Sequence, residues 1–195
     1  MAFPFIVLEG IDGCGKGEQA RELMAWLKKR RTPAILHKYP TEEAKEVQTH
    51  LLGKHTLAPD ALFGAFVQDL QKHQAQLEKD RMHSWVISDR YCLSTAAYQG
   101  INGRLEERIK QLEKYEWVRP DYVFWLDVPV EEAMRRKAAQ KSPDKHEADK
   151  VLLEQVRENF DALYRRRFLC SNYARIDATQ TPARVAANIR AKFES

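Results

Sequence analysis

Residues 5–19 read Phe-Ile-Val-Leu-Glu-Gly-Ile-Asp-Gly-Cys-Gly-Lys-Gly-Glu-Gln, and they carry the strongest signal in the chain. An apolar strand, residues 5–8, runs into Gly10-x-x-x-x-Gly15-Lys16, and a segment with helical periodicity follows. This is the spacing of a phosphate-binding loop, in which backbone N–H groups and the positive end of the next helix surround phosphate oxygens. Lys16 is expected to reach the outer phosphates of a nucleoside triphosphate. The predicted nucleotide-binding residues are Gly10, Ile11, Asp12, Gly13, Cys14, Gly15, Lys16, Gly17 and Glu18.

Position 17 departs from the common form of this loop. The usual residue after the lysine is Ser or Thr, whose hydroxyl binds Mg²⁺, but here Gly17 and Glu18 follow. A glycine also occurs at this position in adenylate-kinase-like loops, so we still expect nucleotide binding, with the metal held by other groups. Glu18 either binds Mg²⁺, repels the nucleotide or, in the simplest interpretation, stabilises the positive end of the helix.

The composition is that of a soluble globular protein, which we expect to form one domain over residues 1–195. The chain is 44% hydrophobic and 31% charged, and its net charge of +4 suits anionic ligands without indicating DNA binding. The basic clusters at residues 28–31 and 165–167 each close a predicted helix, where cations stabilise its negative end. We therefore expect no nucleic-acid partner, and no signal peptide or membrane partner because long apolar runs are absent.

The cysteines indicate the compartment. Cys14, Cys92 and Cys170 are widely spaced along the chain. They form neither a metal-binding pattern nor a disulfide framework, which is typical of a reducing environment. We therefore expect a cytoplasmic protein.

Short apolar runs alternate with longer helical patterns. The expected strands are residues 5–8, 34–37, 85–88, 122–126 and 173–176. The expected helices are residues 15–29, 41–52, 59–78, 93–98, 105–115, 130–139, 147–168 and 182–193. Continuous apolar strands between helices predict an α/β fold with a parallel sheet covered on both faces. Ligands of such sheets bind beyond the carboxyl ends of the strands.

A second motif, Ser88-Asp89-Arg90-Tyr91, closes the apolar strand at residues 85–88. Asp89 is then expected at the carboxyl end of that strand, beside the phosphate-binding loop. A carboxylate there can hold Mg²⁺ through water molecules or position an attacking oxygen. The planar guanidinium of Arg90 can bind a phosphate through two hydrogen bonds. A purely structural ion pair is the alternative, and the nearby loop favours the functional interpretation.

These motifs together resemble the thymidylate kinase family. The resemblance is carried by Glu9-Gly10-Ile11-Asp12-Gly13-x-Gly15-Lys16, by Asp89-Arg90-Tyr91-x-x-Ser94-x-x-Ala97-Tyr98-Gln99-Gly100, and by residues 120–128 and 144–147. It implies a P-loop kinase fold, a three-layer sandwich with a five-stranded parallel sheet and a helical lid at about residues 137–148. It also implies a homodimer that transfers the γ-phosphoryl group of ATP to dTMP, forming dTDP, with Mg²⁺.

The resemblance assigns roles near the phosphates. Asp12 would approach the 3′-hydroxyl of the acceptor, Arg90 would bridge the donor and acceptor phosphates, and Asp89 would organise the ligands of Mg²⁺. Arg136 would lie against the adenine of ATP, and Glu147 would close over the site from the lid.

The resemblance also implies an acceptor site. Tyr39 and Pro40 would line it, and Tyr98 would pack under the deoxyribose and disfavour a 2′-hydroxyl. Two positions have alternatives: Ser94 or Thr95 would border the base together with Gln99, and either Phe63 or Phe66 would stack on the base. Each phenylalanine can instead be a core residue.

The charges that stabilise the moving phosphoryl group are expected from the lid. Some family members carry an arginine where this chain has Gly13, so this chain resembles the class that uses basic lid residues. The candidates are Lys137, Lys141 and Lys145, with Lys141 and Lys145 assigned to catalysis. Lysine lacks the bidentate geometry of arginine, so stabilisation would be weaker or differently arranged, and solvated loop charges are the alternative.

Two departures concern the acceptor. After Tyr39-Pro40 the family usually has an arginine for the monophosphate, where this chain has residues 41–43, Thr-Glu-Glu. Between Leu62 and His73 the family carries an arginine that donates to the thymine ring, whereas this chain has no arginine there. Gln68 or Asp69 can instead accept from an exocyclic amine, or Lys72 can replace the arginine, so the acceptor base stays open.

Three alternatives therefore stand beside a dTMP kinase. One is a kinase of the same fold that acts on another monophosphate, such as dUMP or dCMP. Another is a nucleotide-binding regulatory protein without catalysis, which Gly17-Glu18 favours and Lys16, Asp89 and Arg90 oppose. The third, a nucleic-acid-stimulated ATPase, predicts salt-sensitive polynucleotide binding, and the modest net charge gives it little support.

Overall fold

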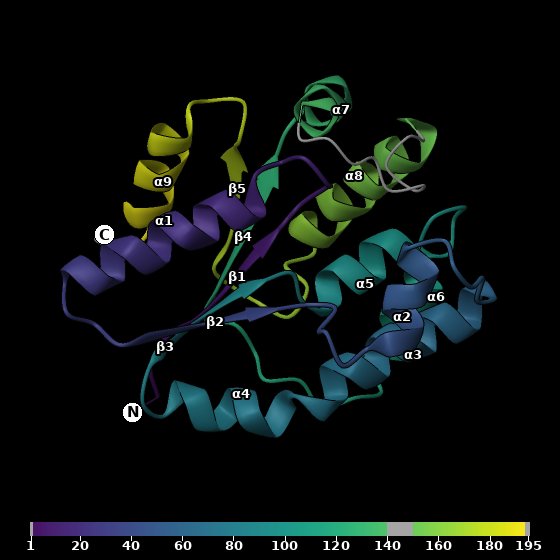
Figure 1. Cartoon of the computed structure of the whole chain (residues 1–195), viewed down its shortest axis with the longest axis horizontal. Coiled ribbons are helices and arrows are strands. Elements are labelled where there is room, and N and C mark those ends of the chain that lie inside the picture. Colours follow the sequence, from purple (N-terminus) through teal and green to yellow (C-terminus); the bar gives the residue numbers. More distant parts are fainter. Residues whose placement is uncertain (1, 140–149, 194–195) are drawn as a thin grey trace.

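The computed structural model describes residues 2–139 and 150–193 of the chain. Its centre is one sheet of five strands in the order β2-β3-β1-β4-β5 (Figure 1). Every neighbouring pair is parallel. The strands are β1 (Phe5–Glu9), β2 (Ala34–Lys38), β3 (Trp85–Asp89), β4 (Tyr122–Asp127) and β5 (Tyr173–Asp177).

Helices cover both faces of this sheet. The described helices are α1 (Lys16–Lys29), α2 (Lys45–Leu51), α3 (Pro59–Lys72), α4 (Gln74–Arg81), α5 (Cys92–Gln99), α6 (Leu105–Leu112), α7 (Val130–Ala138), α8 (Lys150–Arg165) and α9 (Pro182–Arg190). Helices α1 and α9 contact each other on one side of the sheet, and α5 and α8 contact each other on the other side (Figure 1). The predicted α/β sandwich with a five-stranded parallel sheet is confirmed. Among the residues that the structure describes, no helix is both long and apolar enough to cross a membrane.

The position of each strand in the sheet explains how deeply its residues are buried. All five residues of β1 are buried, as are the last five of β4, because these central strands have helices on both faces. The edge strand β2 is more exposed, with Ile35 and Leu36 partly open to solvent. With β1 between β3 and β4, the chain segments that follow these three strands meet at one edge of the sheet, where α/β proteins bind ligands.

The predicted strands are confirmed, and each extends one residue further at its carboxyl end. The prediction of a single helix at residues 59–78 is wrong, because α3 ends and α4 begins around His73. His73 Nδ1 lies 2.8 Å from the Asp69 carbonyl oxygen, and Gln74 Nε2 donates to the Leu70 carbonyl at 2.8 Å. These side chains satisfy carbonyls at the end of α3, so the helix ends without exposing unpaired groups.

Other helices also differ from their predicted bounds, and α9 ends at Arg190 rather than at residue 193. The helix expected at residues 41–52 begins only at Lys45, and α8 ends at Arg165 rather than at residue 168. Beyond α8, Arg167 has a left-handed backbone with φ of 49°. Helix α6 ends at Leu112, whose carbonyl accepts a hydrogen bond from Trp117 Nε1 at 2.8 Å. The end of α6 thus depends on a side-chain contact that helical periodicity does not contain.

We predict that Ile87→Ala lowers the free energy of unfolding by about 2–5 kcal/mol, since Ile87 is fully buried in β3 and truncation leaves a cavity. Ile35→Ala is the matched control on the adjacent strand β2. Ile35 is 36% exposed, so its truncation should cost less than about 1 kcal/mol. Urea unfolding of both variants measures the difference, and equal losses would contradict this account of the core.

Candidate active site

The phosphate-binding loop joins β1 to α1, as predicted. Gly10 and Gly13 have positive φ angles of 142° and 86°. A Cβ atom on Gly10 would lie 2.6 Å from the Leu126 carbonyl oxygen, and one on Gly13 would overlap the backbone of Ala133. The loop therefore packs against the end of β4 and against α7 so closely that these two positions require glycine.

Lys16 lies inside this loop. Its side chain is only 6% exposed, and Nζ donates to the carbonyl oxygens of Gly10 at 2.8 Å and Ile11 at 3.0 Å. The same atom lies 3.7 Å from Cys14 Sγ and 3.9 Å from Asp12 Oδ1. Glu18 is exposed in the first turn of α1, where a carboxylate stabilises the positive helix end.

Arg90 reaches the loop from the neighbouring strand. It follows β3 with φ of 72°, and its guanidinium forms an ion pair with Asp12. Arg90 Nη1 donates to Ser94 Oγ at 3.4 Å, and the guanidinium carbon lies 5.3 Å from the centre of the Tyr98 ring. Tyr98 in turn accepts, through its hydroxyl, a hydrogen bond from the Asp12 backbone N–H at 2.9 Å. The structure thus brings together the loop and the second motif.

The carboxylate of Asp12 is the meeting point of these charges. Although burial by itself would raise its pKa, the charges of Arg90, Lys16 and Lys137 hold the pKa of Asp12 well below its usual value. Asp12 therefore stays ionised, and the two cations Lys16 and Arg90 face one common carboxylate.

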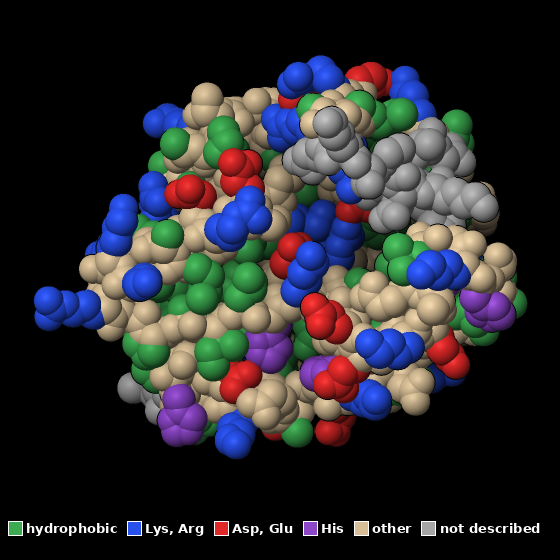
Figure 2. All heavy atoms as spheres, in the orientation of Figure 1, with side chains coloured by type: hydrophobic (Ala, Val, Ile, Leu, Met, Phe, Trp, Pro, Cys, Tyr) green, Lys and Arg blue, Asp and Glu red, His purple; other side chains and the backbone are tan. Residues whose placement is uncertain are grey.

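Beside the loop lies a cavity of about 770 Å³. Figure 2 shows a hollow near the centre of the molecule with Lys and Arg side chains at its bottom. Eleven of the predicted residues line this cavity, namely Asp12, Tyr39, Pro40, Phe66, Asp69, Arg90, Ser94, Thr95, Tyr98, Gln99 and Lys137. Its size suits a mononucleotide-sized ligand.

The two predicted stacking residues differ in position. Phe66 on α3 lines the cavity, whereas Phe63 does not. Phe63 is 7% exposed, and its ring lies 4.5 Å from the guanidinium carbon of the buried Arg108. Of the two alternatives, the structure therefore brings Phe66 to the cavity and makes Phe63 a core residue.

Other predicted residues lie away from the cavity. Arg136 on α7 donates to Glu132 at 2.7 Å and is not part of the cavity wall. Gln68 and Lys72 are exposed and are also not part of it. Lys141, Lys145 and Glu147, and most of the predicted lid, lie outside the described residues.

Asp69 has a structural contact that the sequence interpretation missed. Its two carboxylate oxygens accept hydrogen bonds from Thr41, one from the backbone N–H at 2.9 Å and one from the hydroxyl at 2.5 Å. Asp69 therefore holds the segment after Tyr39-Pro40 against α3. This bonding engages both oxygens of the carboxylate that the sequence offers as an acceptor for an exocyclic amine.

Asp89 fits a metal ligand. It is 8% exposed at the end of β3, and among the described residues its Oδ1 has no hydrogen-bond partner. The loop approaches it closely, since a Cβ atom on Gly17 would lie 3.5 Å from Asp89 Oδ2. No group of three or more His, Cys, Asp or Glu side chains that could hold a metal occurs at residues 2–139 and 150–193. A Mg²⁺ ion held by the Asp89 carboxylate would complete its coordination with water and phosphate oxygens, which is its usual preference.

Glu9, to which the sequence analysis assigned no role, positions Arg90 through hydrogen bonds to the residues that follow it. It is fully buried and accepts hydrogen bonds from the Tyr91 N–H at 2.8 Å and from the Ser94 N–H at 3.1 Å. Its second oxygen accepts from the Ser94 hydroxyl at 2.5 Å. Because these bonds hold the residues that follow Arg90, Glu9 fixes the turn that carries the guanidinium. The sequence signal for this role was a carboxylate placed directly after an apolar run, at the end of a strand.

The sheet and the loop at its carboxyl edge define a P-loop nucleotide-binding protein. The family model described as thymidylate kinase matches residues 8–189. The chain is 35% identical over 183 residues to the thymidylate kinase of Parasynechococcus marenigrum, covering 86% of this chain and 87% of the relative. It is 39% identical over 170 residues to the probable thymidylate kinase of Thermococcus onnurineus, and the match covers 80% of this chain and 82% of the relative.

The fold agrees with these relatives. The solved thymidylate kinase from Candida albicans superposes with a TM-score of 0.82 at 23% identity, over 99% of this chain and 92% of that one. The chain belongs to the thymidylate kinase family, which confirms the resemblance predicted from the motifs.

Glu9 makes stability depend on pH. Burial raises its pKa from 4.5 to about 7, against the opposing hydrogen bond from Ser94. Between these two values the folded protein holds a proton that the unfolded chain has released, so the free energy of unfolding falls as pH rises, by about 3 kcal/mol in total.

We predict that this fall in the free energy of unfolding with rising pH is absent in Glu9→Gln, because glutamine does not titrate. Urea unfolding of both proteins at pH 5 and pH 8 measures it. A wild-type protein whose stability relative to Glu9→Gln is the same at both pH values would contradict the prediction.

Proposed function

We propose that this member of the thymidylate kinase family transfers the γ-phosphoryl group of ATP to dTMP, forming dTDP, with Mg²⁺. The observation that carries the proposal is the common approach of Lys16 and Arg90 to Asp12 at the edge of one cavity. Cations from the start of α1 and from the segment after β3 meet at one point and supply the charge that phosphoryl transfer requires. This reaction needs positioning and electrostatic stabilisation more than covalent chemistry.

Each cation has a separate task. Lys16 lies within the loop, so it binds the outer phosphates of the donor and exchanges its present carbonyl partners for phosphate oxygens. Arg90 lines the acceptor cavity and holds the acceptor phosphate toward the donor. Lys141 and Lys145, assigned by the family resemblance, would add positive charge at the transferring group. The family resemblance is also the basis for proposing a homodimer with a lid at residues 137–148, and the cysteine pattern is the basis for proposing a cytoplasmic location.

The acceptor is oriented by groups around the cavity. Phe66 offers a flat apolar surface for the base. Tyr98 is held by its bond with the Asp12 N–H, so its ring forms a fixed wall for the sugar. Asp12 is ionised and can accept a hydrogen bond from the 3′-hydroxyl.

Asp89 would hold the metal. A bound Mg²⁺ would neutralise charge on the donor phosphates during transfer. The role of Asp89 is to offer its carboxylate at the end of β3, where Oδ2 lies on the side of Gly17 and Oδ1 has no hydrogen-bond partner among the described residues. Gly17 contributes no hydroxyl, so this carboxylate supplies the protein's part of the site.

Steady-state ADP formation with a panel of dTMP, dUMP, dCMP, dAMP and dGMP tests the function. We expect dTMP to be preferred, and Lys16→Ala and Arg90→Ala each to lower kcat/KM by at least about 100-fold, because each removes charge at the transferring group. Lys29→Ala and Arg165→Ala are controls, since these are cations at exposed helix ends. A protein that forms ADP with none of these acceptors, or variants as active as the controls, would disprove the proposal.

Gly17→Ser tests the metal site. The new hydroxyl would lie beside Asp89, where a side chain has room, because the nearest atoms to a Cβ are 3.5 and 3.8 Å away. We expect the Mg²⁺ concentration for half-maximal activity to fall about fivefold, the value of one added polar contact. Gly17→Ala adds the carbon without the oxygen and should leave that concentration unchanged. The same shift in both variants would rule out a role for the hydroxyl.

A further inference from the structure

The cations of the cavity fall into two groups. Lys38, Arg90, Arg104 and Lys137 all line it. Arg90 is paired with Asp12, Lys137 lies close enough to Asp12 to lower its pKa, and Lys38 ends β2 in register with Asp89. These three belong to the end beside the phosphate-binding loop. Arg104 is different, because it contacts Asp60 at the start of α3 and Glu107 on α6.

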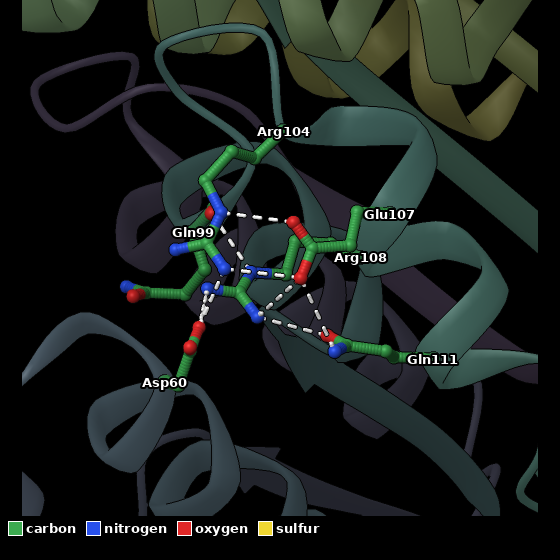
Figure 3. Close-up of polar contacts among 6 residues, drawn as sticks. All are labelled: Asp60, Gln99, Arg104, Glu107, Arg108 and Gln111. Atoms are coloured by element: carbon green, nitrogen blue, oxygen red, sulfur yellow. Dashed lines mark hydrogen bonds and ion pairs between the residues drawn. The ribbon is translucent and has the colours of Figure 1, made fainter.

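Arg104 is held by two carboxylates. Its Nη2 donates to Asp60 Oδ1 at 2.6 Å and to Glu107 Oε1 at 3.0 Å, and its Nε donates to Glu107 Oε2 at 2.9 Å. The remaining nitrogen, Nη1, makes no hydrogen bond within the described part of the chain. In Figure 3 one nitrogen of this guanidinium has no dashed line and points away from Asp60 and Glu107. The side chain is thus oriented while two N–H donors stay available.

The anchor of Arg104 is itself fixed by Arg108. Arg108 is fully buried, and its Nη2 donates to the same oxygen of Asp60 at 2.6 Å (Figure 3). Its Nε donates to the Gln99 carbonyl at 3.1 Å, and its guanidinium lies over the Phe63 ring. Arg108 therefore ties α3, the end of α5 and α6 together. Because these contacts fix Asp60, the position of Arg104 is set before a ligand binds.

The cavity-wall residues of α3 and the side-chain amides of Gln99 and Asn102 do not select a base by themselves. The residues that α3 contributes to the wall are Pro59, Leu62, Phe66, Asp69 and Leu70, and none of these side chains is an N–H donor. The amides of Gln99 and Asn102 also line the cavity, but an amide offers a donor and an acceptor and can turn to suit either kind of base. A guanidinium only donates.

We propose that Arg104 is the residue that selects the base, by donating a hydrogen bond from Nη1 to the 4-keto oxygen of a pyrimidine. In a pyrimidine nucleotide the C4 position lies opposite the N1 that carries the sugar, so it lies farthest from the phosphate. This matches a cation that contacts Asp60 and Glu107 rather than the phosphate-binding loop. The inference rests on the proposed function and adds the means by which thymine or uracil is distinguished from cytosine.

The chemical basis is the direction of the hydrogen bond. The 4-keto oxygen of thymine or uracil accepts from Arg104, whereas the 4-amino group of cytosine donates and would face a second donor. A buried donor without a partner is costly, so a donor-only side chain rejects the amine. The absence of an arginine from residues 62–73 is then compensated by an arginine from the segment that follows α5.

Steady-state kinetics of Arg104→Gln with ATP and dTMP, dUMP or dCMP test the inference. Glutamine can both donate and accept, so the ratio of kcat/KM for dTMP to that for dCMP should fall at least about tenfold, the value of a hydrogen bond to a charged group. The change should lie in KM for dTMP and dUMP, with kcat little affected. Arg166→Gln is the matched control, because Arg166 also pairs with a glutamate of α6, Glu106, at similar exposure, 38% against 33%.

A second variant keeps the test independent of the folding of the first. Glu107→Gln leaves Arg104 in place but removes the charge of its two-bond anchor, so the dTMP to dCMP ratio should fall about threefold. Thermal unfolding of all variants identifies any that fail to fold. An unchanged ratio in the folded variants, or an equal loss with all three acceptors, would overturn the inference while leaving the proposed function intact. A wild-type protein inactive on both dTMP and dUMP would instead disprove the proposed function.

Discussion

The ionised carboxylate of Asp12 is the constraint on which the site depends. Lys16 and Arg90 come from different elements, and two cations held close together in a buried site repel each other strongly. Asp12 lies between them and is bonded through its backbone to Tyr98, so one residue places the phosphate-binding loop, the second motif and the cavity wall relative to one another. A phosphate group brings the negative charge that allows both cations to turn toward a ligand.

Buried polar residues hold the surroundings of this carboxylate in place. Glu9 fixes the turn after Arg90, Asp69 fixes the segment after Tyr39-Pro40, and Arg108 joins the helices at the other end of the cavity. Each uses two or more hydrogen bonds, which limits the cost of burying its charge. The cavity is therefore shaped before a nucleotide binds, and this lowers the ordering cost of binding.

The comparison of predicted and observed elements shows where local patterns suffice. The strands were predictable because a strand buried on both faces must be continuously apolar. The break at His73 was not, because it depends on hydrogen bonds from His73 and Gln74 to the last carbonyls of α3. Phe63 and Phe66 lie three residues apart on one helix face, so periodicity cannot separate them. In the folded structure Phe63 packs against the buried guanidinium of Arg108, whereas Phe66 lines the cavity.

The sequence alone predicted the phosphate-binding loop, the order of strands and helices and the family to which the chain belongs. These features depend on residues close together in the chain, because loop spacing and apolar runs are local properties. The pairing of Asp12 with Arg90 joins positions 78 residues apart, and it required the sheet order that sets β3 beside β1 with Leu8 in register with Asp89. The place of Arg104 likewise followed from contacts among α3, α5 and α6. Such contacts depend on how the elements pack, and packing is decided by the whole chain at once.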